Sequence, residues 1–373
     1  MDSVNDDFAD QLSQWAVKFH VTHSAVSALV KILRTKYSNL SKDARTLLST
    51  PNTFEIDKHI QNLSGRSYYH FGIEQGVKQC LHQHVTVHNL QSVSIQVNVD
   101  VVPLFKSNKS QFWPILGMLC KPFRSQPFLI GLFYGVSKPT NLDFMNDFVE
   151  EYKHLHQIGL NYRHTVLPLS VHAFVCDAPA RAMLKNVKCH SGYHSCERCT
   201  QRGEWLNKVV YPETHAPLRS DASLQMLDGD HHHGSAPLIQ TGINLVSDVV
   251  LDCMHLVYLG VMRRLIFLWM KGPFKCRQSQ ISIQSISVNL LLYKAFIPSE
   301  FARKPRALCE IKQWKATEFR QFLLHTGPVA LLGKLPRTVY KNFLLLSIAK
   351  RVLLNESLCK IYNDMQRPSL WHL

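Results

Sequence analysis

The chain has 373 residues, of which 46% are hydrophobic and 10% aromatic, so it can bury cores for two or three domains. Lysine and arginine number 42 against 27 aspartates and glutamates, a formal net charge of +15 that favours a polyanionic partner, nucleic acid above all. The acidic amino terminus has no apolar export signal, and the longest apolar candidate, residues 256–270, is interrupted by Arg263 and Arg264. A secreted or membrane protein is therefore not expected.

The ten cysteines point to the same kind of compartment. Without an export signal they are expected to stay reduced, so metal binding is favoured over disulfide formation. Together with the charge, this predicts an intracellular protein located in the nucleus.

Residues 1–88 form the first predicted domain, a helical region. Apolar residues recur at helical spacing in two stretches: Phe8, Leu12, Trp15, Ala16 and Phe19 in the first, then Ala25, Leu29, Ile32 and Leu33 in the second. Stripes of this kind usually pack against other helices, which predicts a packing module. A DNA-binding module is the alternative, although no pattern here is typical of base recognition.

Residues 89–203 form the second predicted domain, in which the hydrophobic period changes to two. The expected elements are strands over 92–100, 112–119 and 128–134, a helix over 142–155, a fourth strand over 169–175 and a helix over 179–187. This order is that of the RNase H-like fold. The expected fold class is therefore α/β, an RNase H-like core between a helical amino-terminal region and a helical carboxy-terminal insertion.

Residues 204–373 form the third predicted domain, a polar loop followed by an incomplete helical insertion. The triplet His231-His232-His233 is flanked by aspartates and glycines, which predicts a flexible polar loop rather than a metal site. An apolar helix is expected over 249–270. Further apolar helical segments are expected over 290–296, 314–324 and 340–353.

Two aspartates stand at predicted strand ends. Asp100 ends the first strand and Asp177 follows the fourth. These strands are neighbours in an RNase H-like sheet, so the two carboxylates would emerge side by side. Two-metal phosphoryl transfer needs hard oxygen ligands that hold Mg²⁺ ions roughly 4 Å apart. A single strand-end aspartate is more often a turn residue or a helix cap, but the pair in this order predicts a Mg²⁺ or Mn²⁺ site.

Cys196 and Cys199 form a C-x-x-C, whose sulfurs can reach one tetrahedral Zn²⁺. A structural zinc site needs four ligands, and Cys189, His190 and His194 are close enough in sequence to complete it locally. The alternative is a pair of ordinary thiols. A redox role is disfavoured because the flanks are polar and basic and no βαβ redox context surrounds the pair.

Asp252 and His255 open the apolar helix and, three residues apart, share one helix face. They could orient each other or touch a metal site. The alternative is a helix cap next to a histidine whose hydrogen bonds are satisfied.

Several stretches of the chain resemble the transposases of the CACTA (En/Spm-like) group, in the version found in animal genomes as transposase domain-containing proteins. The matching stretches are DARTLL (43–48), YYHFG (68–72), DVVPLFKS (100–107), FWPILG (112–117), CDAPARA (176–182), HSGY (190–193), the C-x-x-C, MHL (254–256) and WKATEFR (314–320). They cover most of the chain.

The resemblance implies a DDE-type RNase H-like domain interrupted by a helical insertion. Such an enzyme hydrolyses a phosphodiester at transposon ends and uses the freed 3′-OH to attack target DNA. By position, Asp100 is similar to the first metal-binding acid and Asp177 to the second. Asp252 and His255 are similar to the D-x-x-H element that follows, and the C-x-x-C to half of a zinc site completed by a His pair beyond the insertion.

The chain departs from the family pattern in two places. The third acid and the His pair are expected beyond the insertion, inside which the sequence stops, so Glu318 is the best substitute, with Glu310 behind it. Val101 replaces the usual glycine. We therefore expect a Mg²⁺-dependent transposase that is truncated and catalytically impaired, whose partners are double-stranded DNA and further copies of the chain.

Two alternatives stay open. One is a domesticated or decayed copy that binds DNA or protein without catalysis. The other is an unrelated zinc-stabilised adaptor whose strand pattern mimics the core.

Overall fold

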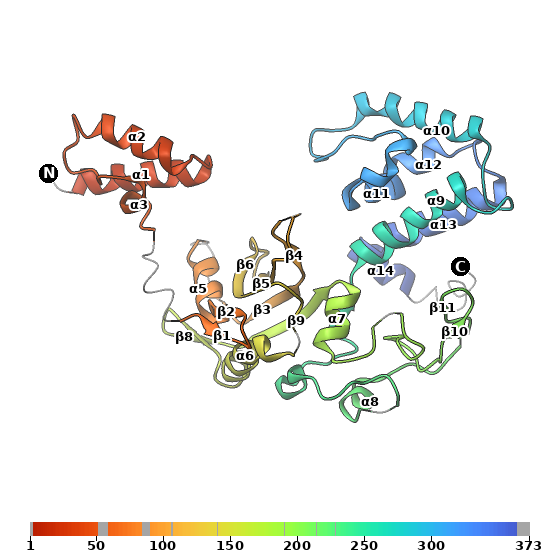
Figure 1. Cartoon of the computed structure of the whole chain (residues 1–373), viewed down its shortest axis with the longest axis horizontal. Coiled ribbons are helices and arrows are strands. Elements are labelled where there is room, and N and C mark those ends of the chain that lie inside the picture. The colour runs from red at the N-terminus through yellow and green to blue at the C-terminus, as the bar shows by residue number, and fades with distance from the viewer. Residues whose placement is uncertain are drawn as a thin grey trace. The chain divides into compact units, whose positions relative to one another are not determined.

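A computed structural model gives the fold of two compact units, Met1–Tyr69 and His70–Leu373 (Figure 1). The structure describes residues 3–50, 59–83, 90–105, 107–139, 141–189, 191–213, 215–227 and 229–363. The protein is a mixed α/β protein with a central mixed sheet, flanking helices and helical regions near both ends. Within the described ranges, each helix is too short or too polar to span a bilayer.

The first unit contains three helices: α1 (Ser3–Lys18), α2 (His23–Leu33) and α3 (Ala44–Leu47), drawn in red in Figure 1. Side-chain oxygens of Thr22 and Asp43 cap α2 and α3 by accepting backbone N–H groups. The helices pack through small and branched residues: Ala16, Val26, Val30, Ala44 and Leu47. The expected stripe was partly wrong, because Trp15, Phe19 and Ile32 are exposed while their smaller neighbours face the core.

A short hairpin follows the three helices, where the sequence predicted only helix. It consists of β1 (Gln61–Asn62) and β2 (Ser67–His70), paired antiparallel. Gly65 takes a φ of +79° in the connecting turn, a conformation that glycine adopts without steric cost.

The central sheet of the second unit has the order β6 (Phe128–Gly135), β5 (Gln111–Lys121), β3 (Val93–Val99), β9 (Leu169–Cys176) and β12 (Val249–Leu251). Strands β3, β9 and β12 are parallel, whereas β5 runs antiparallel to both of its neighbours; β4 (Val102–Pro103) pairs with the start of β5. The four longer strands confirm those predicted from alternation. In β3 the alternating valines and Ile95 are fully buried.

Helices α5 (Ile73–Gln83) and α6 (Asn146–Ile158) flank this sheet and contact each other. Glu151 of α6 fixes the start of α5, because its carboxylate accepts the N–H groups of Ile73 and Glu74 and also contacts His70 at 2.7 Å. Gly76 allows α5 close to the sheet, since a Cβ there would lie 2.1 Å from the Phe128 ring. The hairpin of β7 (Leu160–Tyr162) and β8 (Thr165–Leu167) then leads into β9.

Strand β12 was not predicted, because the sequence indicated helix from residue 249 onward. Val249 instead pairs with Phe174, and Leu251 pairs with Cys176. Three residues are too few to display an alternating pattern. The connection from α7 (Ala178–Leu184) to β12 contains β10 (Glu204–Trp205), β11 (Val209–Val210), α8 (Asp221–Gln225) and the 3₁₀ turn η2 (Pro237–Thr241).

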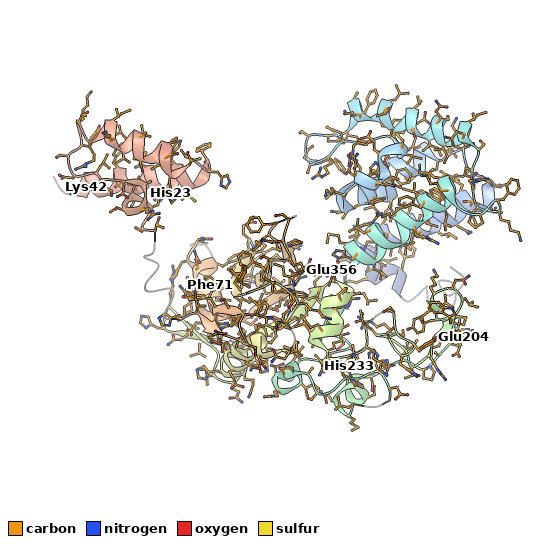
Figure 2. The ribbon with its side chains drawn as sticks, in the orientation of Figure 1. His23, Lys42, Phe71, Glu204, His233 and Glu356 are labelled. Carbon is orange, nitrogen blue, oxygen red and sulfur yellow. The ribbon has the colours of Figure 1, made fainter. Side chains whose placement is uncertain are left out.

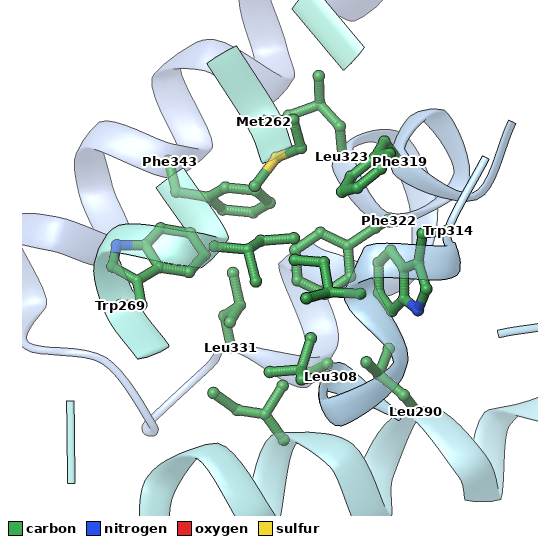
Figure 3. Packing of buried hydrophobic residues seen from close by; sticks show 14 of the residues in the cluster. Met262, Trp269, Leu290, Leu308, Trp314, Phe319, Phe322, Leu323, Leu331 and Phe343 are labelled. Carbon is green, nitrogen blue, oxygen red and sulfur yellow. The ribbon is translucent and has the colours of Figure 1, made fainter. Parts of the chain in front are cut away.

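The remaining elements are helical and begin with a π-helix, η3 (Met254–Met262), that runs into α9 (Arg263–Lys271). They continue with α10 (Gln280–Tyr293), η4 (Lys294–Phe296), η5 (Leu308–Gln313), α11 (Ala316–Gln321), the π-helix η6 (Phe322–Thr326), α12 (Gly327–Ala330), α13 (Arg337–Leu353) and α14 (Glu356–Asn363). Their common core is rich in aromatic rings, among them Trp269, Trp314, Phe319, Phe322 and Phe343 (Figure 3). The three apolar helical segments predicted here are confirmed.

Candidate functional site

Three neighbouring parallel strands each end at an aspartate. Asp100 follows β3, Asp177 follows β9, and Asp252 follows β12. Backbone pairing of Leu251 with Cys176, and the hydrogen bond from Val99 N to Cys176 Sγ, align the three strand ends. Open α/β sheets bind ligands at the carboxyl ends of their strands, so this edge is the candidate site.

Asp100 interacts electrostatically with the other acids of this edge. Burial raises the pKa of its carboxyl group, and the negative charges of Asp177 and Asp252 raise it further. The Val101 N–H, which donates to Asp100 Oδ1 at 2.7 Å, and His255 act in the opposite direction. The carboxylates are therefore close enough to repel one another, which a bound cation would relieve.

Asp177 also begins a helix. Its Oδ1 accepts the N–H of Ala180 at 2.8 Å and so caps α7, whose first turn contains Pro179. Asp177 is thus both a helix cap and one of the acids at the carboxyl edge of the sheet. Because the cap uses Oδ1, Oδ2 is the oxygen that could face a cation.

Asp252 and His255 orient each other. Oδ1 of Asp252 accepts the N–H of Met254 at 2.8 Å, and Oδ2 accepts the His255 N–H at 3.1 Å. The His255 ring places Nδ1 at 2.5 Å from the same Oδ2, so Nδ1 carries the donated proton. In the neutral form of this ring, Nε2 is the nitrogen with the free lone pair, as in histidines that bind metals or accept protons.

The donor set at this edge suits one kind of cation. In the part of the chain that the structure describes, no three His, Cys, Asp or Glu side chains converge as a metal-binding group. Mg²⁺ is commonly held by one or two carboxylates together with water and substrate phosphates. Asp100 and Asp177 are ligands of the type that Mg²⁺ or the similar Mn²⁺ takes.

Glu318, the expected substitute for a third acid, lies at the start of α11 and is buried. Its two carboxylate oxygens accept from Nε and Nη2 of Arg306 at 2.7 and 2.8 Å, and Oε2 also accepts the Lys315 N–H at 2.7 Å. Glu310 contacts the same guanidinium at 3.7 Å. These contacts are structural, and the charges that act on Asp100 come from Asp177, Asp252 and His255 instead.

Cys196 and Cys199 place their sulfurs 3.2 Å apart, and the Cys199 N–H points to Cys196 Sγ at 3.4 Å. Burial and the neighbouring Cys196 raise the pKa of the Cys199 thiol. The pair could supply two ligands to zinc. Among the described residues no third ligand joins the pair, and His194 Nε2 lies 3.8 Å from Asp230, so the expected local completion stays a prediction. His190 lies outside the described residues.

A buried ion network joins the C-x-x-C segment to the acidic edge. Glu197 binds Arg181 through three contacts of 2.9 to 3.2 Å and Lys185 at 3.0 Å. Arg181 Nη1 also donates to the carbonyl of Cys176, the residue before Asp177, at 2.7 Å. Burial would raise the pKa of Glu197, but the two cations hold it below its ordinary value. This network was not predicted from the sequence. The four-residue spacing of Arg181 and Lys185, which puts both cations on one helix face, was the one sequence feature that indicated it.

The histidine triplet lies in a loop, as the sequence predicted, but its first histidine is not exposed to solvent. His231 is fully buried, and its Nδ1 lies 2.6 Å from the carbonyl oxygen of His194. Burial lowers the pKa of His231 to about 4, so the ring is neutral near neutral pH. His231 therefore packs against the segment that leads into the C-x-x-C. Figure 2 labels two residues of this part of the chain, Glu204 and His233.

No family model and no curated protein matches this chain.

The raised pKa of Asp100 predicts an unusual effect of its substitution. A carboxyl group whose pKa is raised on folding destabilises the folded protein at pH values above that pKa and costs nothing below its unfolded pKa, about 4. In metal-free protein near neutral pH, Asp100→Asn should therefore raise the thermal midpoint by roughly 2 °C, and the gain should vanish in acid. Asp230→Asn, at an exposed carboxylate, is the control in a calorimetric pH series. A lower thermal midpoint for Asp100→Asn would show that the Asp100 carboxylate stabilises the fold and would contradict this prediction.

Proposed function

We propose that the chain is a transposase-derived protein with an RNase H-like core, which binds Mg²⁺ or Mn²⁺ at Asp100 and Asp177 and acts on DNA phosphodiesters in the nucleus. Strand order supports the fold: counting β3, β5, β6, β9 and β12 as first to fifth, the sheet order is third, second, first, fourth, fifth. The second strand alone is antiparallel to its neighbours. First and fourth strands lie side by side, as that fold requires.

One observation carries the proposal: the neighbouring parallel strands β3, β9 and β12 end at Asp100, Asp177 and Asp252, which brings the three acids to one edge of the sheet. Acids placed together against their mutual repulsion, at the ligand-binding edge of a sheet, are typical of a cation site. A divalent ion bound there would activate the attacking oxygen and stabilise the leaving oxygen. Asp100 and Asp177 would hold it, while Asp252 keeps Nε2 of His255 available to the reacting groups.

Zinc is proposed as a second, structural metal. The Cys196 and Cys199 thiols, already adjacent and receiving an N–H, would supply two of its four ligands. Through Glu197 and Arg181 the same segment supports the strand that ends at Asp177.

The test is Mn²⁺ binding by calorimetry to the whole chain and to Asp100→Asn and Asp177→Asn. Each substitution removes a charged ligand, so affinity should fall at least about tenfold, the equivalent of 1.4 kcal/mol. Asp230→Asn should bind as the unsubstituted chain does. Nicking of duplex DNA with Mg²⁺ should disappear in both site variants. Equal Mn²⁺ affinity in all four proteins would rule out the site.

The second candidate function is DNA binding without cleavage. The hydrogen bonds of the other two acids favour it. Both carboxylate oxygens of Asp252 and both of Glu318 already accept hydrogen bonds within the chain. A third metal ligand would then be lacking. Mn²⁺ binding and salt-sensitive DNA binding without nicking would identify this case.

A further inference from the structure

The positive charge of the chain is concentrated in its helical carboxy-terminal part. Residues 263–363 contain 18 lysines and arginines but four glutamates and no aspartate, a net charge of +14 out of the +15 of the whole chain. The strand-rich part is thus nearly neutral. A polyanion is expected to be held mainly by the helices.

One cavity among these helices combines several hydrogen-bond donors. It has a volume of about 330 Å³ and is lined by Glu300, Phe301, Ala302, Arg303, Thr317, Arg320, Gln321 and His325. Its walls are the segment before η5, helix α11 and the π-helix η6. Phe301 and His325 meet edge to face, with ring centroids 5.3 Å apart, and close one side.

The donors of this cavity are not used up by the protein. Arg303 and Arg320 are exposed, and neither forms an ion pair with any acid of the described residues. Gln321 is only 3% exposed, yet its Nε2 has no hydrogen-bond partner in the described part of the chain. A buried amide without a partner costs stability, so a ligand that accepts its hydrogen bond would be favoured.

The surroundings of His325 show that cationic side chains gather around the cavity. Burial lowers the pKa of His325, and the cations Arg351 and Arg320 lower it further. Several positive charges therefore lie close together around the cavity, while Glu300 is the single acid in its described lining. Such a surplus is what a phosphate group neutralises.

We propose that this cavity binds a backbone phosphate of nucleic acid, with Arg303 and Arg320 supplying charge and Thr317 and Gln321 supplying hydrogen bonds. The assignment rests on the proposed function, in which DNA is the substrate. Arg320 also hydrogen-bonds Tyr258 of η3, the π-helix that begins one residue before His255. Helix α11 packs against η3, so the cavity and the acidic edge are connected through one helix.

The test measures binding of a fluorescent DNA duplex to the whole chain in EDTA over a series of salt concentrations, in an Asp100→Asn background. Loss of the metal site cannot then affect the result. Arg303→Gln and Arg320→Gln should each weaken binding about 3- to 10-fold and lower the slope of log affinity against log salt by about 1. Gln321→Leu and Thr317→Val should weaken binding with the slope unchanged.

Lys341→Gln is the matched control, because it removes one exposed charge of the same helical part outside the cavity. If it weakens binding as much as Arg320→Gln, or if both uncharged variants bind normally, charge is spread diffusely and the pocket is wrong. Inorganic phosphate at matched ionic strength forms the other arm. Tight phosphate binding that Arg320→Gln abolishes, without any change in DNA affinity, would assign the cavity to a free anion and overturn the proposal.

Discussion

Glu197→Leu is expected to destabilise the second unit by about 3 to 5 kcal/mol, the usual cost of leaving a buried charge unpaired. The side chain of Lys185 is fully buried and that of Arg181 is 6% exposed, and both lose their counter-charge when Glu197 is removed. Burial already lowers the pKa of Lys185, so part of the loss should be met by deprotonation of this amine. Urea unfolding followed by circular dichroism measures the effect.

The same substitution should also weaken Mn²⁺ binding. Arg181 is held by Glu197 while its Nη1 binds the Cys176 carbonyl, so the strand end before Asp177 loses a support. Glu204→Gln, at an exposed carboxylate on β10, is the control and should change neither quantity. The triple variant in which Arg181 and Lys185 also become methionine should recover most of the stability but not the Mn²⁺ affinity. A loss below about 1 kcal/mol for Glu197→Leu would mean that water reaches the network.

Glu318→Ala is expected to cost a similar 3 to 5 kcal/mol, because Arg306 would lose a bidentate partner and α11 its capping carboxylate. Mn²⁺ affinity should stay unchanged. Glu310→Gln is the matched control: its carboxylate is 41% exposed and reaches the same guanidinium at 3.7 Å, so the loss should stay below about 1 kcal/mol.

This experiment separates a structural acid from a metal-binding one. A Glu318 that completed the metal site would show the opposite result, with Mn²⁺ binding lost and stability nearly kept. The double variant with Arg306→Met should recover stability only in the structural case, since the cation that was left alone is then also removed.

The four longer strands could be predicted because the hydrophobic pattern of each is local in the sequence. The neighbouring positions of Asp100 and Asp177 then followed from the order of the elements. Alternation over β3 and the apolar runs of β5, β6 and β9 marked four strands, and the element order then placed two strand ends side by side. The place of Asp252 could not be predicted this way. Its strand has only three residues, and it joins the sheet by backbone pairing with β9. The paired residues Val249 and Phe174 are 75 positions apart in the sequence.

Tertiary contacts also decide the surroundings of residues that lie far apart in the sequence. His231 lies among aspartates and glycines, which predict a loop, yet the fold buries it against the carbonyl of His194. Glu318 stands in the stretch WKATEFR, but the contacts of its carboxylate depend on Arg306, twelve residues earlier. Neither partner can be chosen from spacing alone, because many charged and polar groups lie at similar distances along the chain.

Because β12 is short, the position of Asp252 depends on the register in which β12 pairs with β9. Side chains of a strand alternate between the two faces, so a slip by a single residue would move Leu251 to the position now held by Asp252 or Val250 and reverse every side chain of the strand. Only three backbone pairings oppose such a slip. The connection that precedes β12 therefore has to keep its length, even where its sequence is free to change.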